Sequence, residues 1–313
     1  MNLNQSALRN CEALLGGPHL QRLAVIRDES GARVIDCGVH VVGGLDVGCR
    51  LAEICLAGLG QVTLGAAIPG LGPVPVVVVR TDLPVLACMA SQYAGWQIAG
   101  EKFFAMGSGP MRAVRGREKL FEALGYQESA FEVLGVLESG KLPTRDVCHH
   151  IAEECRVDPE RLTLLVAPTA SLAGTIQVVA RTVETALHKL HELGFDLRQV
   201  CCGMGMAPLP PVARNDLEGI GRTNDAVLYG GDVTLWVTAE DAALESLGPQ
   251  VPSAASRDFG RPFGELFRQY NHDFYKIDPL LFSPAVVQMV NLKSGRHFRF
   301  GELRPDILQQ SWA

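Results

Sequence analysis

The chain has 313 residues, of which 47% are hydrophobic and 20% are charged. This composition excludes a wholly disordered chain, and the length allows two ordinary domains or one large domain with an added lobe. The formal net charge of −6 argues against a nucleic-acid-binding protein, because such a protein normally presents a basic face.

Signals for export are missing from the sequence. The first residues are polar, without the basic start and apolar core of a signal peptide, and no apolar run reaches the ~20 residues of a transmembrane helix. The nine cysteines include no CxxC pair, which is more typical of reduced thiols than of a disulfide framework. We therefore expect a cytoplasmic protein.

The first part of the chain is predicted to contain mainly short strands. Thr81-Asp-Leu-Pro84 predicts a helix start, because a capping residue is followed by proline in the first turn. The Gly107-Ser-Gly-Pro110 turn opens another helix; its amides could bind an anion, although a plain tight turn is the simpler interpretation. The predicted helices cover residues 4–16, 81–93 and 111–125, and the predicted strands cover residues 23–27, 33–37, 53–59, 61–66, 73–80, 96–99 and 131–138.

The pattern of apolar residues changes once between Leu162 and Gly194, from a continuous run to a helical repeat. Residues 162–166 form an apolar run long enough for one buried strand. From Leu172 onward, apolar residues recur every three or four positions, as on one face of a helix. We expect a single helix from Leu172 to Gly194, capped by Ser171 and ended by Gly194 in a left-handed turn.

The polar face of this helix carries Arg181, Glu184 and His188 in one stripe, with Gln177 one turn earlier. Spacing alone favours a solvated face with an exposed Arg–Glu pair, which contributes only a few tenths of a kcal/mol. An active-site role requires that the stripe face a cleft, and the spacing does not decide this.

Helices and hairpins alternate in the rest of the chain. The predicted helices cover residues 144–155, 216–222, 239–247 and 305–311, the strands cover residues 199–202, 225–229, 232–238, 286–292 and 296–300, and the loops cover residues 203–211 and 249–262. This pattern predicts a mixed α/β fold built of α+β layers, not a purely parallel sheet. We expect two lobes, residues 1–141 and 142–313, with C-terminal strands that could return to the first lobe.

Two histidines and two cysteines have the side-chain types of a tetrahedral zinc site. They are His188, His191, Cys201 and Cys202. Their spacing is poor, because adjacent cysteines on a strand point to opposite faces. No P-loop, dinucleotide-binding glycine motif or GxSxG motif occurs. The residues alone indicate an enzyme-like α/β protein, and a zinc-dependent cyclohydrolase or deaminase remains an alternative.

Nine segments, in order along nearly the whole chain, together resemble the methenyltetrahydromethanopterin cyclohydrolase family. They are Val34-Ile-Asp-Cys-Gly-Val39, Thr81-Asp-Leu-Pro84, Ala94-Gly-Trp96, Phe103-Phe-Ala-Met-Gly-Ser-Gly-Pro-Met-Arg-Ala113, Ile151-Ala-Glu-Glu-Cys155, Val166-Ala-Pro-Thr169, Gly221-Arg-Thr-Asn-Asp-Ala-Val-Leu-Tyr-Gly-Gly231, Pro252-Ser-Ala-Ala-Ser256 and Asp273-Phe-Tyr-Lys-Ile-Asp278. The resemblance implies two closely packed α/β lobes with a pterin in the cleft between them, a homotrimer, and no metal or organic cofactor.

The resemblance also implies the reaction and its catalytic residues. Water adds to the methenyl carbon that bridges two pterin nitrogens, which gives the 5-formyl compound. In the family a glutamate and the arginine three residues before it carry this chemistry, and they correspond to Glu184 and Arg181. Such a glutamate supplies a base for the water and a negative charge beside the cationic substrate, and the arginine keeps it ionised.

Substrate contacts are implied on several segments, including the Gly107–Pro110 turn and residues 223–225. The expected substrate-binding residues are Tyr93, Gly107, Ser108, Gly109, Thr169, Ser171, Gln177, Asn224 and Asp225. Tyr93 departs from the pattern of archaeal relatives, which place a lysine there, so no charged contact carries over. A non-catalytic pterin-binding protein is the remaining alternative, and the intact Arg181 and Glu184 argue against it.

Overall fold

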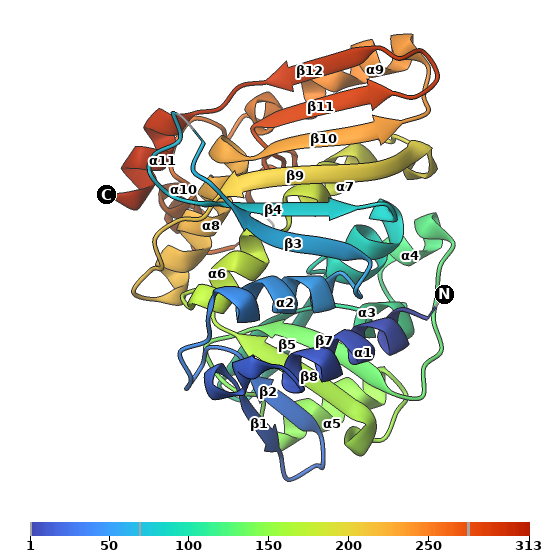
Figure 1. The fold of residues 1–313 in the computed structure, drawn as a ribbon, viewed down its shortest axis with the longest axis vertical. Coiled ribbons are helices and arrows are strands. Elements are labelled where there is room, and N and C mark those ends of the chain that lie inside the picture. Colours follow the sequence, from blue (N-terminus) through green and yellow to red (C-terminus); the bar gives the residue numbers. More distant parts are fainter. Residues whose placement is uncertain (1, 69, 274–275) are drawn as a thin grey trace. The chain divides into compact units, whose positions relative to one another are not determined.

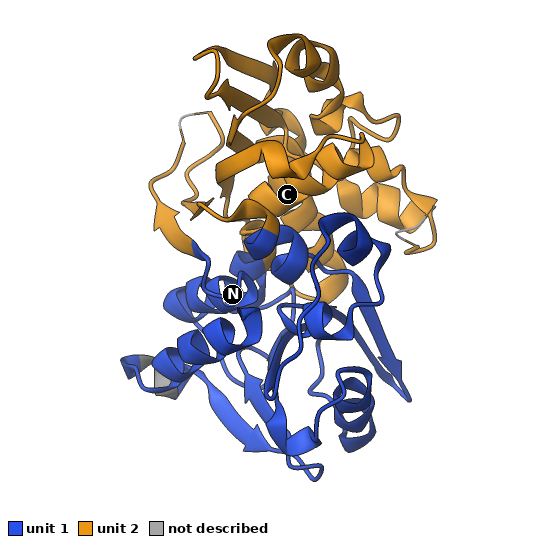
Figure 2. Cartoon of the chain, turned by 90° about the vertical axis from the view of Figure 1, so that its right-hand side faces the viewer, with its two compact units in different colours: residues 1–60, 86–177 blue, residues 61–85, 178–313 orange. Residues whose placement is uncertain are grey.

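The computed structural model divides the chain into two compact units (Figure 2). The residues described are 2–68, 70–273 and 276–313. Unit 1 contains residues 1–60 and 86–177, and unit 2 contains residues 61–85 and 178–313. Each unit is built on one six-stranded sheet, so the predicted mixed α/β class is confirmed. The predicted lobe boundary at residues 141 and 142 lies inside unit 1, and the division into lobes stays a prediction.

The sheet of unit 1 has the strand order β1-β2-β8-β7-β6-β5. Its strands are β1 (Ala24–Arg27), β2 (Arg33–Asp36), β5 (Trp96–Gly100), β6 (Phe103–Ser108), β7 (Val133–Glu138) and β8 (Leu162–Ala167). The three strands β2, β8 and β7 run parallel, and β1, β6 and β5 are added in antiparallel hairpins or pairs (Figure 1). The hairpin predicted at the start of the chain is confirmed.

Helices cover both faces of this sheet, which explains why β8 is apolar throughout. Leu165 and Ala167 belong to a core cluster with α1 and α2, whereas Leu164 and Val166 belong to a second cluster with α5. Alternate side chains of a strand point to opposite faces, so a strand covered on both sides is continuously hydrophobic. The helices of unit 1 are α1 (Leu3–Leu15), α2 (Leu45–Cys55), α3 (Met111–Arg115), α4 (Lys119–Leu124) and α5 (Arg145–Glu154), together with α6 (Leu172–Val179) as far as Gln177.

The sheet of unit 2 has the order β12-β11-β10-β9-β4-β3. Its strands are β3 (Gly60–Gly65), β4 (Val76–Thr81), β9 (Val200–Pro208), β10 (Asp232–Val237), β11 (Val286–Asn291) and β12 (His297–Gly301). The β10–β11 pair is parallel, whereas β4–β9, β9–β10 and β11–β12 are antiparallel. The predicted C-terminal hairpin is therefore confirmed as β11 and β12.

The helices of unit 2 include a packed group of three, α8, α10 and α11, which share one hydrophobic cluster. The bounds are α7 (Thr182–Glu192), α8 (Asp216–Gly230), α9 (Asp241–Leu247), α10 (Phe263–Gln269) and α11 (Pro305–Trp312). Short 3-10 helices complete the chain at η1 (Pro18–Arg22), η3 (Pro159–Arg161), η4 (Leu197–Gln199), η5 (Gly248–Gln250), η6 (Ser253–Ala255) and η8 (Pro279–Leu281).

Three predicted elements have the wrong type. Residues 53–59 were expected to form a strand, but they contain the end of α2, because that short apolar run is part of a longer amphipathic helix. Residues 203–211 were expected to form a loop, yet β9 continues to Pro208 in the interior of the sheet. The strand and hairpin predicted at 225–231 are wrong, because α8 continues to Gly230 and buries this apolar stretch in a helical core.

Two other predicted helices are present but differ in detail, one by a break and the other by its helix type. The helix expected over 111–125 is interrupted at Gly116, whose left-handed φ of 62° ends α3. The helix expected over 81–93 is a π-helix, η2 (Val85–Gln92), and the N–H of Tyr93 accordingly donates to the carbonyl of Cys88, five residues earlier. π-Helical turns are frequent at functional sites.

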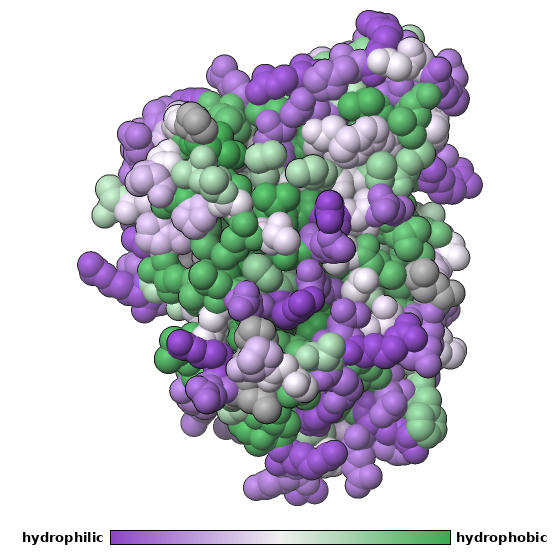
Figure 3. Space-filling model, viewed as in Figure 1, coloured by the Kyte–Doolittle hydropathy of each residue, from purple (hydrophilic) through white to green (hydrophobic). Residues whose placement is uncertain are grey.

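The surface shows hydrophilic and hydrophobic residues intermixed over the face drawn in Figure 3. Within the described part of the chain, no helix combines the length and the apolar character needed to cross a membrane. All nine cysteines are free thiols; six of them are buried, Cys49 and Cys202 are partly exposed, and Cys201 is exposed.

Candidate active site

Arg181 and Glu184 lie where the helix expected over residues 172–194 breaks into two. α6 ends at Val179, and α7 begins at Thr182 with Arg181 as its N-cap residue. The N–H of Thr185 donates to the carbonyl of Arg181 at 2.8 Å, which closes the first turn of α7. Glu184 belongs to this first turn, where the partial positive charge of the helix N-terminus favours a carboxylate.

Both catalytic candidates are buried. Arg181 has a relative exposure of 6%, and Glu184 has one of 4%. The solvated face that spacing alone favoured is therefore excluded for these two residues. A carboxylate withdrawn from water needs positive charge or hydrogen-bond donors nearby, and Glu184 lies in the first turn of α7, at the positive end of the helix.

His188, the third member of the stripe, differs from the other two. Its side chain is half-buried, and Nε2 lies 3.8 Å from a carboxylate oxygen of Glu192. Burial lowers the pKa of His188, against the opposing effect of Glu192, so its imidazole is mostly neutral at pH 7. The stripe thus consists of a buried arginine, a buried glutamate and a partly exposed histidine.

Two glycines of β9 let the first turn of α7 approach the sheet. A Cβ atom at Gly203 would lie 2.8 Å from Cγ1 of Val183, and one at Gly205 would lie 2.7 Å from Oγ1 of Thr182. Both distances are shorter than a van der Waals contact. A side chain at either position would therefore clash with α7, and only glycine allows the helix and β9 to pack this closely. The glycines of the Gly203-Met-Gly segment, predicted as a loop, therefore position the turn that carries Glu184.

Ser108 lies at the end of β6 in a buried polar cluster of unit 1. Its hydroxyl donates to the carbonyl of Val136 at 3.3 Å and lies 3.3 Å from the Cys55 thiol. Gln177, on α6, donates from Nε2 to the same thiol at 3.5 Å. The structure thus brings two predicted substrate-binding residues together through Cys55, a residue that the sequence did not single out.

The glycines on either side of Ser108 are engaged within unit 1. Gly107 pairs with Trp96 in the β5–β6 ladder, and a Cβ there would lie 2.8 Å from the side chains of both Ile98 and Met111. Gly109 has a φ of 84°, and its N–H donates to the carbonyl of Ser91 at 2.9 Å. These contacts explain the two glycines without an anion.

Thr169 and Ser171 shape the start of α6. The Ser171 hydroxyl accepts from the N–H of Gly174 at 3.0 Å and donates to the carbonyl of Pro168 at 2.8 Å, so the predicted cap is confirmed. The carbonyl of Thr169 accepts from the Thr175 hydroxyl at 3.0 Å. Gly194 has a φ of 79°, and the predicted left-handed end of α7 is confirmed as well.

Tyr93 follows the π-helix and contacts a buried cation. The guanidinium carbon of Arg112 lies 4.9 Å from the centre of the Tyr93 ring. Arg112 is fully buried, pairs with Glu118, and donates to the carbonyls of Met89 and Ser91 at 3.2 and 3.1 Å. Arg112 thus holds the end of η2 in place and supplies a positive charge next to Tyr93.

Asn224 and Asp225 lie on α8 and not on the strand expected there. The Asn224 amide donates to the carbonyl of Ile220 at 2.8 Å. Asp225 is completely buried, and its Oδ1 accepts from the N–H of Phe263 at 2.8 Å, which joins α8 to the start of α10. Burial raises the pKa of Asp225 to about 7, against the lowering effect of hydrogen bonds from Ser311 and Phe263.

Lys189, a buried lysine on α7, is a residue that the sequence pattern did not single out. Lys189 is fully buried, and its ammonium group donates to the carbonyl of Leu280. Desolvation lowers the pKa of Lys189 to about 8, although Asp278 opposes this effect. Its position one helical turn after the buried Ala186 was the available signal.

The arrangement of histidines and cysteines does not support the zinc alternative. Cys201 and Cys202 lie in β9, and His188 lies near Glu192. Across residues 2–68, 70–273 and 276–313, no three His, Cys, Asp or Glu side chains gather as metal ligands would. A tetrahedral zinc site needs such a group.

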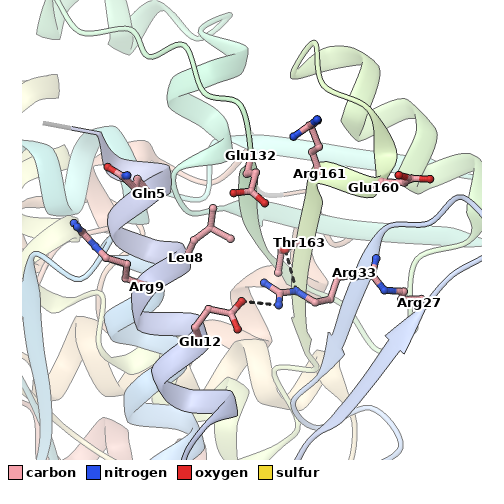
Figure 4. A pocket seen from close by; sticks show the side chains of 10 residues that line it. All are labelled: Gln5, Leu8, Arg9, Glu12, Arg27, Arg33, Glu132, Glu160, Arg161 and Thr163. Carbon is pink, nitrogen blue, oxygen red and sulfur yellow. Dashed lines mark hydrogen bonds and ion pairs between the residues drawn. The ribbon is translucent and has the colours of Figure 1, made fainter.

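A pocket of about 420 Å³ in unit 1 has no predicted site residue among its lining side chains (Figure 4). Its lining residues are Gln5, Leu8, Arg9, Glu12, Arg27, Arg33, Glu132, Glu160, Arg161 and Thr163. Arg33 is held by Glu12 and by the Thr163 hydroxyl. Four arginines and three glutamates line this pocket, so charges of both signs surround it.

Comparison with known proteins gives the class of this protein and then its family. The fold is that of an α/β protein in which an arginine and a glutamate are buried at the start of α7. The family model for Cyclohydrolase (MCH) matches residues 2–312, and the chain belongs to this family.

Relatives with curated names extend over nearly the whole chain. A methenyltetrahydromethanopterin cyclohydrolase of Rhodopirellula baltica is 50% identical over 292 residues, covering 90% of this chain and 86% of its own length. The protein of that name from Methylobacillus flagellatus is 49% identical, with 93% and 89% covered. The one from Methanococcoides burtonii is 43% identical, with 91% and 89% covered.

Proposed function

We propose that this chain hydrolyses 5,10-methenyltetrahydromethanopterin to the 5-formyl compound, reversibly, in one-carbon metabolism. The observation that carries the proposal is the burial of Arg181 and Glu184 together at the start of α7. Relatives at 43% to 50% identity bear the name of this enzyme. A buried carboxylate with a cation beside it is suited to a reaction that needs a base and a negative charge.

The proposed mechanism uses Glu184 twice. The methenyl carbon belongs to an amidinium-like cation, so it is already electrophilic. Glu184 takes one proton from water while the water oxygen bonds to this carbon. The bond from the carbon to N10 then breaks, the hydroxyl becomes the formyl carbonyl with loss of its proton, and protonated Glu184 returns its proton to N10. The overall reaction adds one water and releases one proton.

Arg181 keeps Glu184 competent in this scheme. A carboxylate removed from water tends to take up a proton, and an adjacent guanidinium opposes this. Arginine is suited to the task because it stays charged and presents several donors in a fixed plane. Arg181 therefore acts on the state and orientation of Glu184.

Substrate contacts are proposed for the remaining predicted residues of each unit. In unit 1 these are Tyr93, Gly107, Ser108, Gly109, Thr169, Ser171 and Gln177, and in unit 2 they are Asn224 and Asp225. The carboxylate of Asp225 accepts a hydrogen bond from the first residue of α10. We therefore propose that Asp225 holds its neighbour Asn224 in position. The proposal includes a homotrimer in the cytoplasm and neither a metal nor an organic cofactor.

Loss of the methenyl-pterin absorbance on addition of the purified protein tests the proposal. We expect multiple turnovers, unaffected by a chelator. Ligand binding without turnover would instead support the non-catalytic alternative, and chelator-sensitive turnover with stoichiometric zinc would support the zinc-dependent one.

A further inference from the structure

The thiol of Cys55 has two neighbours that can accept its proton. The hydroxyl of Ser108 lies 3.3 Å from the sulfur and, because it donates to the carbonyl of Val136, is free to accept. The thiol also points to the carbonyl of Gln92 at 3.9 Å. In either case the S–H proton is directed away from Gln177, and the sulfur faces Gln177 as an acceptor.

This direction decides which end of the Gln177 amide faces the thiol. A glutamine amide has an oxygen end and a nitrogen end of nearly equal size, and the hydrogen bonds around it determine their assignment. A sulfur that accepts requires the NH₂ end, which matches the Nε2–Sγ distance of 3.5 Å. Oε1 of Gln177 is therefore turned away from Cys55.

The oxygen so oriented is an acceptor that lacks a donor. Gln177 has a relative exposure of 1%, and Oε1 has no hydrogen-bond partner within the described residues of the chain. Buried carbonyl oxygens are normally satisfied, so one without a donor is a site at which water or a bound molecule can donate a hydrogen bond. Gln177 lies on α6 four residues before Arg181.

We propose that Cys55 is a positioning residue, whose thiol fixes the Gln177 amide so that Oε1 accepts a hydrogen bond from a ring N–H of the pterin substrate. This inference rests on the proposed function, because the pterin is the donor. Without the thiol the amide can turn over and present NH₂ to the substrate N–H, and two donors then face each other. Cys55 thus acts on binding through Gln177 and does not touch the reacting carbon.

The test compares two buried cysteines of unit 1. Cys55→Ala should raise KM about 3- to 10-fold, the effect of one hydrogen bond, and leave kcat within twofold. Cys55→Ser should restore part of the lost affinity, because a hydroxyl also accepts from NH₂. The control is Cys155→Ala, which removes an equally buried thiol that contacts the carbonyl of Met111 and should leave KM unchanged. Equal KM values for Cys55→Ala and Cys155→Ala would overturn the proposal.

A double-mutant cycle separates positioning from a general packing defect. If Cys55 acts through Gln177, Cys55→Ala should have no further effect on KM in a Gln177→Ala background. Independent, multiplying effects would refute the link between the two residues. If Cys55→Ala does not fold, Cys55→Val replaces it, since valine fills the site without an acceptor and the same two outcomes apply. Failure of the proposed function would show separately, as absence of wild-type turnover.

Discussion

Glu184 and Asp225, two of the buried carboxyl groups of unit 2, lie in different surroundings. Glu184 lies in the first turn of α7, at the positive end of the helix and three residues after the N-cap residue Arg181. Asp225 lies inside α8, where its partners are the neutral N–H of Phe263 and the side chain of Ser311. Burial accordingly raises the pKa of Asp225 to about 7.

The comparison teaches that burial alone does not assign a role to a carboxylate. Neutral donors fix the position of Asp225 and join α8 to α10, but they leave the charged form poorly compensated. The positive end of α7 favours the ionised form of a carboxylate in its first turn, the form that the proposed general base requires. The four predictions below test this difference, beginning with the largest expected effect.

Glu184→Gln should lower kcat by about 10²- to 10⁴-fold, the usual contribution of a general base. Glutamine keeps the size of the side chain, so fold and oligomeric state should be retained. Steady-state turnover of the methenyl-pterin measures the effect. The matched control is Glu192→Gln at the other end of α7, a half-exposed carboxylate that should keep the wild-type rate. A rate above about a tenth of wild type for Glu184→Gln would remove Glu184 from the role of base.

Arg181→Ala should lower kcat by about tenfold or more and move the acid limb of the rate–pH profile to higher pH. Loss of the adjacent positive charge makes the Glu184 carboxylate easier to protonate. KM should stay the same or fall, because a repulsion with the cationic substrate is also lost. The control is Arg198→Ala, which breaks an exposed pair with Asp196. A wild-type kcat with an unmoved acid limb would contradict the proposed role of Arg181.

Gly205→Ala should destabilise the protein by about 1–3 kcal/mol, as overpacking of a filled core does. The new Cβ would lie 2.7 Å from the Thr182 hydroxyl, so β9 or the first turn of α7 must move, and kcat should fall with stability. Gly264→Ala is the control within the same unit. There the nearest atom lies at 4.0 Å, and alanine inside α10 should stabilise the helix. Equal urea midpoints for the two variants would show that the glycines of β9 do not position α7.

The sequence predicted those parts of the fold in which local pattern and burial agree. β8, the two terminal hairpins, and the caps at Ser171 and Gly194 follow from period, turn residues and φ preference, and all are confirmed. The strand β9 was missed because its glycines indicate a loop locally. They are instead required by the close approach of α7, which only the tertiary structure creates.

Long-range contacts also limit how much of the site can be predicted from the sequence. Spacing placed Arg181 and Glu184 on a solvated face, and only the family resemblance pointed to catalysis. The break before Thr182 leaves no clear pattern in a stretch that is apolar on both sides of it. Cys55 was missed because its partners Ser108 and Gln177 are 53 and 122 residues away in the chain.

Asp225→Asn is the variant with the smallest expected effect, and it completes the comparison of the two carboxylates. The pKa of Asp225 is raised from 3.8 to about 7 in the folded protein, so the folded state binds its proton more tightly than the unfolded state does. The stability contributed by this proton is fully present below about pH 4 and is lost as the pH rises through about 7. Asparagine keeps an oxygen for the N–H of Phe263 and cannot ionise. The stability of the variant relative to wild type should therefore increase between pH 4 and pH 8, as measured by urea midpoints across this range.

We expect the Asp225→Asn variant to have a kcat within about threefold of wild type and at most a small rise in KM, because α8 and Asn224 keep their places. A loss of rate comparable to that of Glu184→Gln, with an unchanged pH dependence of stability, would make Asp225 the base and reverse the assignment of the two carboxylates.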